Sequence, residues 1–139
     1  MTTQTRPIKV LGEIAFRVKD LDRMQKFYEE VVGLELMRCF PGMAFFKIAE
    51  GYGGHTQILA LFDRTAEPNY AGIEADKTSV DHIAFTIDLT DFESERRRLE
   101  QLDMKIDTTT HAWVKWRSLY FSDPEGNRVE FVCYDEGVS

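Results

Sequence analysis

Glu13 and His82, two potential metal ligands, stand at the same place in a repeated segment. Residues 12–16 read Gly-Glu-Ile-Ala-Phe, and residues 81–85 read Asp-His-Ile-Ala-Phe. Carboxylate oxygens and imidazole nitrogens both bind divalent transition metals. The repeat predicts that the chain consists of two copies of one unit, whose apolar frame is constant while the potential ligand changes.

Alternating side chains predict a strand over residues 9–18. Its two faces are lined by Ile14, Phe16 and Val18 and by Glu13, Ala15 and Arg17. Apolar residues at intervals of three to four positions then predict a helix that begins after Asp20 or Asp22 and ends at Gly33. This helix covers the apolar face, so Glu13 is expected on the open face.

Turn residues divide the rest of the chain into similar elements. Strands are predicted at residues 34–40, 43–50, 55–62, 82–87, 104–108, 116–122 and 127–134. A second helix is expected to start at a capping box of Thr90 and Glu93, with Phe92, Leu99 and Leu102 as its buried stripe. Each copy is then a βαβββ module.

The predicted fold class is α+β, with two tandem βαβββ modules that form a cup-shaped, partly open mixed sheet with the helices outside. We expect one domain over residues 1–139. Module one covers about 8–63, the linker about 64–80 and module two about 81–135. The lining of the cup is the face opposite the helices, and the chemistry is expected there.

Strand parity selects two further ligand candidates. In the strand 55–62, the apolar set Thr56, Ile58, Ala60 and Phe62 is expected to face the helix, which leaves His55, Gln57, Leu59 and Leu61 in the cup. In the last strand, Val129, Phe131 and Cys133 are expected to face the helix, and Arg128, Glu130, Val132 and Tyr134 the cup. Gln57 and Glu130 therefore join Glu13 and His82, with His55 as an alternative to Gln57.

Two interpretations of this set are open. Carboxylates that converge in an apolar cup repel and lose hydration, and a divalent cation bound by Glu13, Gln57, His82 and Glu130 would compensate for both effects. Without a metal, Arg17 and Arg128 share the same faces and could form salt bridges with the two glutamates.

Composition limits the classes of partner. The chain has 139 residues, a hydrophobic share of 43% and a net charge of −7, without an apolar run of membrane-spanning length. We expect a cytoplasmic protein that binds neither nucleic acid nor a membrane, because the cluster Arg96–Arg98 is interleaved with glutamates. Cys39 and Cys133 are expected to be reduced thiols of the core.

Four segments together resemble the vicinal oxygen chelate superfamily, which includes glyoxalase I, extradiol dioxygenases, methylmalonyl-CoA epimerase, fosfomycin-resistance thiol transferases and bleomycin-resistance proteins. They are EIAFRVKDLDR (13–23), VGLEL (32–36), DHIAF (81–85) and LYFSDPEGNRVEF (119–131). The resemblance implies paired βαβββ modules and one divalent metal (Ni, Co, Mn, Fe or Zn). It also implies a ligand from the first and last strand of each module, at Glu13, Gln57, His82 and Glu130.

The superfamily does not fix the reaction. Its glyoxalases suggest Lewis-acid stabilisation of an enediolate, with Glu130 or Glu13 as the base, and thus a lyase or isomerase acting on a small oxygenated substrate. An extradiol-type dioxygenase using Fe(II) is one alternative, although Glu13 replaces the first of its two histidines. A non-catalytic protein that binds a bleomycin-type drug is another. Candidate substrate contacts are Arg17, Arg117, Arg128, His111 and Trp113, and we expect a homodimer.

Overall fold

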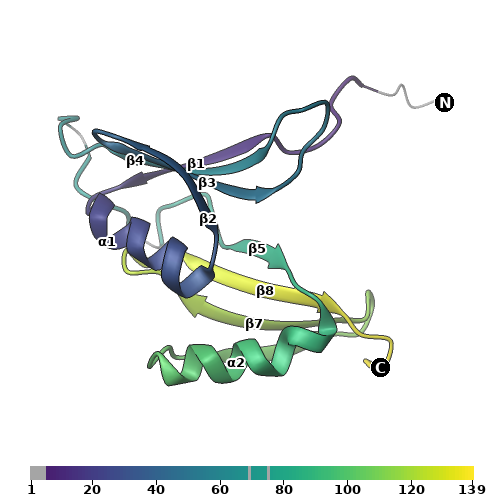
Figure 1. Ribbon diagram of the computed structural model, residues 1–139. Helices are drawn as coiled ribbons and strands as arrows, with labels where there is room; N and C mark the ends of the chain where they lie inside the picture. Colours follow the sequence, from purple (N-terminus) through teal and green to yellow (C-terminus); the bar gives the residue numbers. More distant parts are fainter. Residues whose placement is uncertain (1–5, 69, 75) are drawn as a thin grey trace. The chain divides into compact units, whose positions relative to one another are not determined.

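The computed structural model describes residues 6–68, 70–74 and 76–139, and these divide into two units, Met1–Tyr70 and Ala71–Ser139. Each unit has one four-stranded sheet and one main helix (Figure 1). The α+β class and the two βαβββ modules are therefore confirmed. No helix in the described ranges is long and apolar enough to cross a membrane.

The first unit has the strand order β1-β4-β3-β2. Its elements are β1 (Glu13–Val18), α1 (Leu21–Lys26), η1 (Phe27–Val32), β2 (Glu35–Phe40), β3 (Met43–Ala49) and β4 (Gln57–Asp63). β1 and β4 are parallel, and the other neighbours are antiparallel.

The helix of the first unit begins and ends where predicted. The Asp20 carboxylate accepts a hydrogen bond from the Arg23 N–H at 3.2 Å. α1 continues as the π-helix η1, which ends at Gly33 in the left-handed region with φ 89°. Tyr28 is fully buried and packs against the rings of Phe16 and Phe46. This contact identifies the helix-covered face of the sheet.

The predicted faces of β4 are wrong. Leu59 lies opposite Ile14 and Leu61 opposite Phe16, so both leucines are on the helix-covered face and are fully buried. Ile58, Ala60 and Phe62 instead share the open face with Glu13. A central strand that is apolar on both faces gives no alternation from which its orientation can be read.

The second unit has the strand order β5-β8-β7-β6. Its elements are β5 (Ile83–Thr86), η2 (Leu89–Asp91), α2 (Phe92–Gln101), β6 (Asp107–His111), β7 (Trp116–Ser122) and β8 (Arg128–Tyr134). Its core is formed by Phe85, Phe92, Leu99, Leu119, Phe121, Val129, Phe131 and Cys133. The predicted faces of β8 are confirmed, because Val129, Phe131 and Cys133 belong to this core, while Val132 and Tyr134 on the other face remain accessible.

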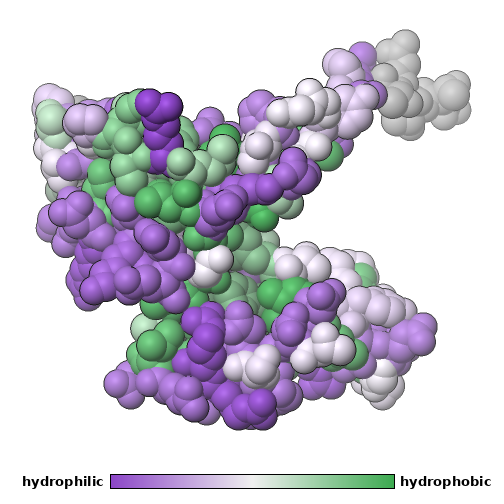
Figure 2. Space-filling view, viewed as in Figure 1, coloured by the Kyte–Doolittle hydropathy of each residue, from purple (hydrophilic) through white to green (hydrophobic). Residues whose placement is uncertain are grey.

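The start of α2 differs from the prediction. A 3-10 turn, Leu89–Asp91, precedes the helix, and no side chain caps the first turn in this part of the described chain. Glu93 forms an ion pair with Arg96 instead of a capping box with Thr90. The outward side of the helix is hydrophilic (Figure 2), and Leu102, expected in the buried stripe, is 45% exposed just after the last helical residue.

Two further expectations are corrected at sheet edges. Strand β6 begins at Asp107, not at residue 104; between α2 and β6 the chain turns at Asp103, with φ 61°, and then runs without regular structure. Cys133 is a buried free thiol as expected, but Cys39 is exposed on β2. β2 is an edge strand, so its apolar residues do not all reach the core.

The turn over residues 123–126 fixes the register of the β7-β8 hairpin. The Asp123 carboxylate accepts hydrogen bonds from the N–H groups of Glu125 and Asn127, both at 2.9 Å. Gly126 supplies the left-handed conformation, with φ 91°. The resulting register places Tyr120 opposite Glu130.

Candidate metal site on the open face of the second sheet

Glu130 lies on the face of the second sheet opposite α2. It stands between Ala84 of β5 and Tyr120 of β7 in the strand register. Although this face carries no helix of its own unit, Glu130 is only 5% exposed. A carboxylate at this depth requires strong partners, because loss of hydration costs several kcal/mol.

Both oxygens of the Glu130 carboxylate are engaged. Oε2 accepts a hydrogen bond from the Ser118 Oγ at 2.6 Å, and Ser118 is fully buried. Oε1 lies 3.0 Å from the His82 Nε2. The carboxylate therefore has a fixed orientation, with one oxygen directed at the imidazole.

His82 faces a carboxylate on each ring nitrogen. Its Nδ1 lies 2.7 Å from the Asp81 Oδ2, while its Nε2 faces Glu130. A neutral imidazole has one N–H to donate, so the second contact needs either another proton or a cation between the groups. A carboxylate that holds Nδ1–H leaves the Nε2 lone pair for a metal, an arrangement common around metal-binding histidines. The donor set therefore fits a metal ion.

Tyr120 completes this group of side chains. Its ring meets the His82 ring edge-on at 6.0 Å, and its hydroxyl lies 3.3 Å from the His111 Nε2. Burial raises the pKa of Tyr120, and the negative charge of Glu130 raises it further. The phenol consequently keeps its proton at neutral pH and can donate it in a hydrogen bond.

Ser118, Tyr120 and Asp81 were not among the site residues predicted from the sequence. Ser118 and Tyr120 alternate with the buried Leu119 and Phe121 along β7. That alternation could have identified both as residues of the open face.

The interpretation without a metal predicted a salt bridge between Arg128 and Glu130. The structure describes both residues and does not contain this salt bridge. The Arg128 guanidinium pairs with Asp107 at 2.7 Å and lies over the ring of Tyr120. Glu130 is instead contacted by neutral or titratable groups, among them Ser118 and His82.

The first unit presents a different set at equivalent positions. Glu13, exposed on the open face of β1, corresponds to His82 in the sequence repeat. Ala15 pairs with Ala60, just as Ala84 pairs with Glu130. The residue equivalent to Glu130 is therefore Ala60, a fully buried alanine.

Comparison with known proteins identifies the family. The model of the Glyoxalase/Bleomycin resistance protein/Dioxygenase superfamily matches residues 10–131. The chain belongs to this superfamily. Metallothiol transferase FosB from Lysinibacillus sphaericus (strain C3-41) is 29% identical over 131 residues, with 89% of this chain and 82% of FosB covered.

Two further proteins illustrate the similarity. Glutathione transferase FosA from Serratia marcescens is 28% identical over 123 residues, with 88% of this chain and 79% of FosA covered. The crystal structure of lactoylglutathione lyase from Agrobacterium tumefaciens is 29% identical, with a TM-score of 0.65 and coverage of 92% of this chain and 96% of the lyase.

Gln57 is not on the open face of β4, where strand parity predicted it. It has the parity of Leu59 and Leu61 on β4, and its Nε2 donates a hydrogen bond to the Leu11 carbonyl at 3.1 Å. His55, the alternative, precedes the strand. In the described part of the chain, no three His, Cys, Asp or Glu side chains lie close enough to share a metal ion.

The predicted substrate residues of this superfamily member lie in different places. His111 is on the open face of the second sheet, beside Tyr120. Arg17 is exposed on β1. Trp113 is 83% exposed, between β6 and β7.

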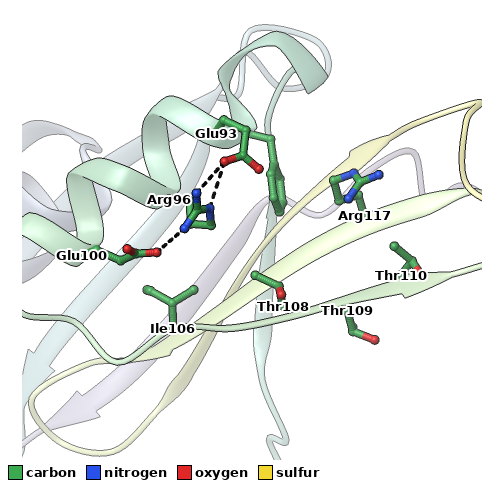
Figure 3. A pocket seen from close by; sticks show the side chains of 9 residues that line it. Glu93, Arg96, Glu100, Ile106, Thr108, Thr109, Thr110 and Arg117 are labelled. Atoms are coloured by element: carbon green, nitrogen blue, oxygen red, sulfur yellow. Dashed lines mark hydrogen bonds and ion pairs between the residues drawn. The ribbon is translucent and has the colours of Figure 1, made fainter.

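Arg117 is on the helix-covered face of the second sheet. It pairs with Asp135 at 2.9 Å and lines a cavity of about 580 Å³ between α2 and β6 (Figure 3). The other lining residues are Phe92, Glu93, Arg96, Glu100, Ile106, Thr108, Thr109 and Thr110. Glu130 lies on the opposite face of this sheet, so Arg117 is not part of the candidate metal site.

Proposed function

We propose that the protein is a divalent-metal-dependent enzyme in which His82 and Glu130 are two of the metal ligands. The observation that carries this proposal is the contact of 3.0 Å between the His82 Nε2 and the Glu130 Oε1, made while Asp81 holds the other ring nitrogen. A cation at this position would satisfy both groups without a second proton on the imidazole.

Glu13 is a further candidate ligand on the sequence repeat alone, because it stands at the position of His82 there. Gln57 is left out, since Ala60 occupies the position equivalent to Glu130 and has no donor atom. Two carboxylates and one imidazole balance the charge of a divalent ion and leave coordination positions for substrate. An oxygen-rich set favours Mn²⁺ or Fe²⁺ over softer ions, so Mn²⁺ is the first metal to test.

A metal held there would supply Lewis-acid stabilisation of negative charge on a substrate oxygen, without a redox change. The residues of the second unit have separate tasks. Ser118 fixes the Glu130 carboxylate, and Asp81 orients the imidazole. Tyr120, which keeps its proton, donates a hydrogen bond to the oxygen on which charge develops.

Thiol transfer to a small electrophile is the reaction we favour. Curated relatives that cover most of the chain are named metallothiol transferase and glutathione transferase. In such a step the thiolate sulfur forms a bond to carbon, a carbon–oxygen bond of the substrate breaks, and its electron pair stays on oxygen. Tyr120 is suited to stabilise that oxygen. The carboxylate in place of a first histidine weakens the Lewis acid but leaves this chemistry possible.

A lyase or isomerase that forms an enediolate is the second candidate, supported by the similarity to lactoylglutathione lyase. This reaction needs a carboxylate base. Glu13 suits that role better than Glu130, because both oxygens of Glu130 are already engaged. The extradiol dioxygenase is less well supported, since Glu13 replaces a histidine ligand.

One experiment separates these functions. Purified protein is loaded with Mn²⁺ and incubated either with glutathione and a small epoxide such as fosfomycin, or with a hemithioacetal. Loss of free thiol with formation of the thioether adduct supports transferase activity, and thioester formation supports a lyase. If neither product forms while Mn²⁺ raises the thermal midpoint, the protein binds metal without either proposed reaction. If no divalent metal raises the midpoint, the metal proposal itself is wrong.

A further inference from the structure

Strand β6 has a sequence that is complementary to itself. It reads Asp-Thr-Thr-Thr-His over Asp107–His111 and lies at the edge of its sheet, next to β7. We propose that β6 pairs antiparallel with β6 of a second copy of this chain, across a twofold axis at Thr109. The two sheets would then join into one continuous eight-stranded sheet.

The register of this pairing follows from the sequence. With Thr109 opposite itself, Asp107 faces His111 of the second copy, and Thr108 faces Thr110. An aspartate and a histidine can form a hydrogen bond, and directly opposed threonines are favourable cross-strand neighbours. Threonine also has a high preference for strands. Twofold symmetry makes the Asp107–His111 and Thr108–Thr110 contacts twice, and the contact between the two Thr109 residues once.

The side chains of Asp107 and His111 each have one polar atom left for a contact across the proposed strand pair. Asp107 uses its Oδ2 to bind Arg128, and His111 uses its Nε2 to contact Tyr120. The Asp107 Oδ1 and the His111 Nδ1 therefore remain for the second copy. Dimer formation need not break either contact within the unit.

The edge of β6 is accessible from both sides. Residues 107–110 are exposed, and His111 is half-buried. On the helix-covered face, the cavity beside Thr108 and Thr110 separates β6 from α2 (Figure 3). A strand that adds to this edge therefore meets no helix of the same unit.

β2, the corresponding edge strand of the first unit, is protected against such pairing. Its register with β3 shifts between Leu36 and Arg38, and Arg38 places a positive charge on the edge. Bulges and cations are devices that prevent edge-to-edge association. β6 pairs with β7 without a register shift and contains no Lys, Arg or Pro, so it lacks these devices.

Sedimentation velocity of the complete chain, over a range of concentrations, tests the proposal. His111→Asp places two aspartates opposite each other at both ends of the strand pair, and should raise the dimer dissociation constant on the order of tenfold. The double change Asp107→His with His111→Asp restores opposite partners. It should return the constant to within a few-fold of that of the unmodified protein, a rescue that mere loss of folding cannot produce.

Thr109→Lys provides a second test, because a lysine at the centre of β6 blocks edge pairing. Met37→Lys is the matched control, since Met37 lies at the bulge of β2 and is already 47% exposed. We expect Thr109→Lys to be monomeric and Met37→Lys to remain dimeric, both with the circular dichroism spectrum of the unmodified protein, which shows that each variant is folded. A monomeric unmodified protein at about 100 µM, or a dimer that neither His111→Asp nor Thr109→Lys weakens, would overturn the proposal.

Discussion

The two sheets have the same plan but carry different groups at equivalent positions. In the first, Ala60 lies beside Ala15, and both positions are apolar. In the second, Glu130 lies beside Ala84 and carries a charge. Both first strands contain the same Ile-Ala-Phe sequence and pair in the same way with the last strand of their sheet. The two sheets therefore share their strand pairing, and single residues on the open face determine which chemical groups each sheet presents.

The second sheet can hold a buried carboxylate because it supplies partners for it. Ser118 and His82 contact the two oxygens of Glu130. The first sheet has Ile58 and Phe62 beside the fully buried Ala60, and neither can form a hydrogen bond. Four substitutions test this contrast between the units.

Glu130→Gln should have the largest effect. It keeps the shape and one oxygen donor but removes the charge, so turnover should fall by roughly 10² to 10⁴ while the fold survives. Steady-state kinetics measure this effect, with whichever of the two substrate mixtures proposed above the unmodified protein converts. Glu136→Gln, an exposed change near the end of the chain, is the control and should retain full activity. Equal losses in the two variants would contradict the role given to Glu130.

Glu13→Gln should be milder for thiol transfer, because an amide oxygen can still bind the metal. In a lyase, the same change removes the proposed base and should abolish turnover while the metal content is unchanged. Metal analysis together with kinetics therefore assigns the base, and a strong loss at Glu13 would favour the second candidate reaction.

Ala60→Glu should destabilise the first unit by about 3–5 kcal/mol, because it buries a carboxylate without partners. Urea unfolding followed by circular dichroism measures the free energy of unfolding. Ala60→Leu, which is larger but uncharged, is the control for steric strain alone. If Ala60→Glu costs no more than Ala60→Leu, the partners on the second sheet are not what makes Glu130 tolerable.

Ser118→Ala should cost about 1–3 kcal/mol of stability, since it leaves one oxygen of a buried carboxylate without its donor. The same unfolding measurement applies. Bound metal should offset part of the loss, because the metal draws charge from Glu130. Ser122→Ala, an exposed serine on the same strand, should change stability little.

Much of this arrangement could be predicted from sequence, for reasons that differ along the chain. In β8, Val129, Glu130 and Phe131 alternate in polarity, so the face of Glu130 was correctly predicted. In β4, the run from Ile58 to Phe62 is apolar on both faces, so the parity of Gln57 was assigned to the wrong side. Local pattern cannot orient a strand that is buried on both faces.

The contacts of Glu130 depend on the register between β7 and β8, which the pattern of residues within one strand does not determine. Ser118 reaches Glu130 only because the turn closed by Asp123 aligns β7 with β8. The resemblance supplied the ligand positions, but it could not indicate that Asp81 and Ser118 support them. The cytoplasmic location stays a prediction.

The smallest expected effect concerns acid stability and compares the ends of the two units. Asp63 and Asp135 each accept a hydrogen bond from the backbone N–H two residues further along the chain. Hydrogen bonds from Thr65 lower the pKa of the Asp63 carboxyl. The Gly137 N–H, and then Arg117, lower the pKa of the Asp135 carboxyl. A lowered carboxyl pKa gives stability that is present above the ordinary value of 3.8 and is lost as the pH falls through the folded value. Asp63→Asn and Asp135→Asn should therefore each flatten the acid side of the stability profile. Unfolding measured from pH 6 to pH 3 tests this, and an unchanged profile in both variants would contradict it.

Pulsed electron paramagnetic resonance of Mn²⁺ added to the protein tests the central claim most directly. Bound Mn²⁺ should show electron spin echo modulation from the nitrogen of one imidazole, with one ion per chain. His82→Gln should remove the nitrogen signal, while His55→Gln and His111→Gln should leave it intact. Absence of saturable Mn²⁺ binding, or a nitrogen signal that persists in His82→Gln, would contradict the assignment of His82 and Glu130 as metal ligands.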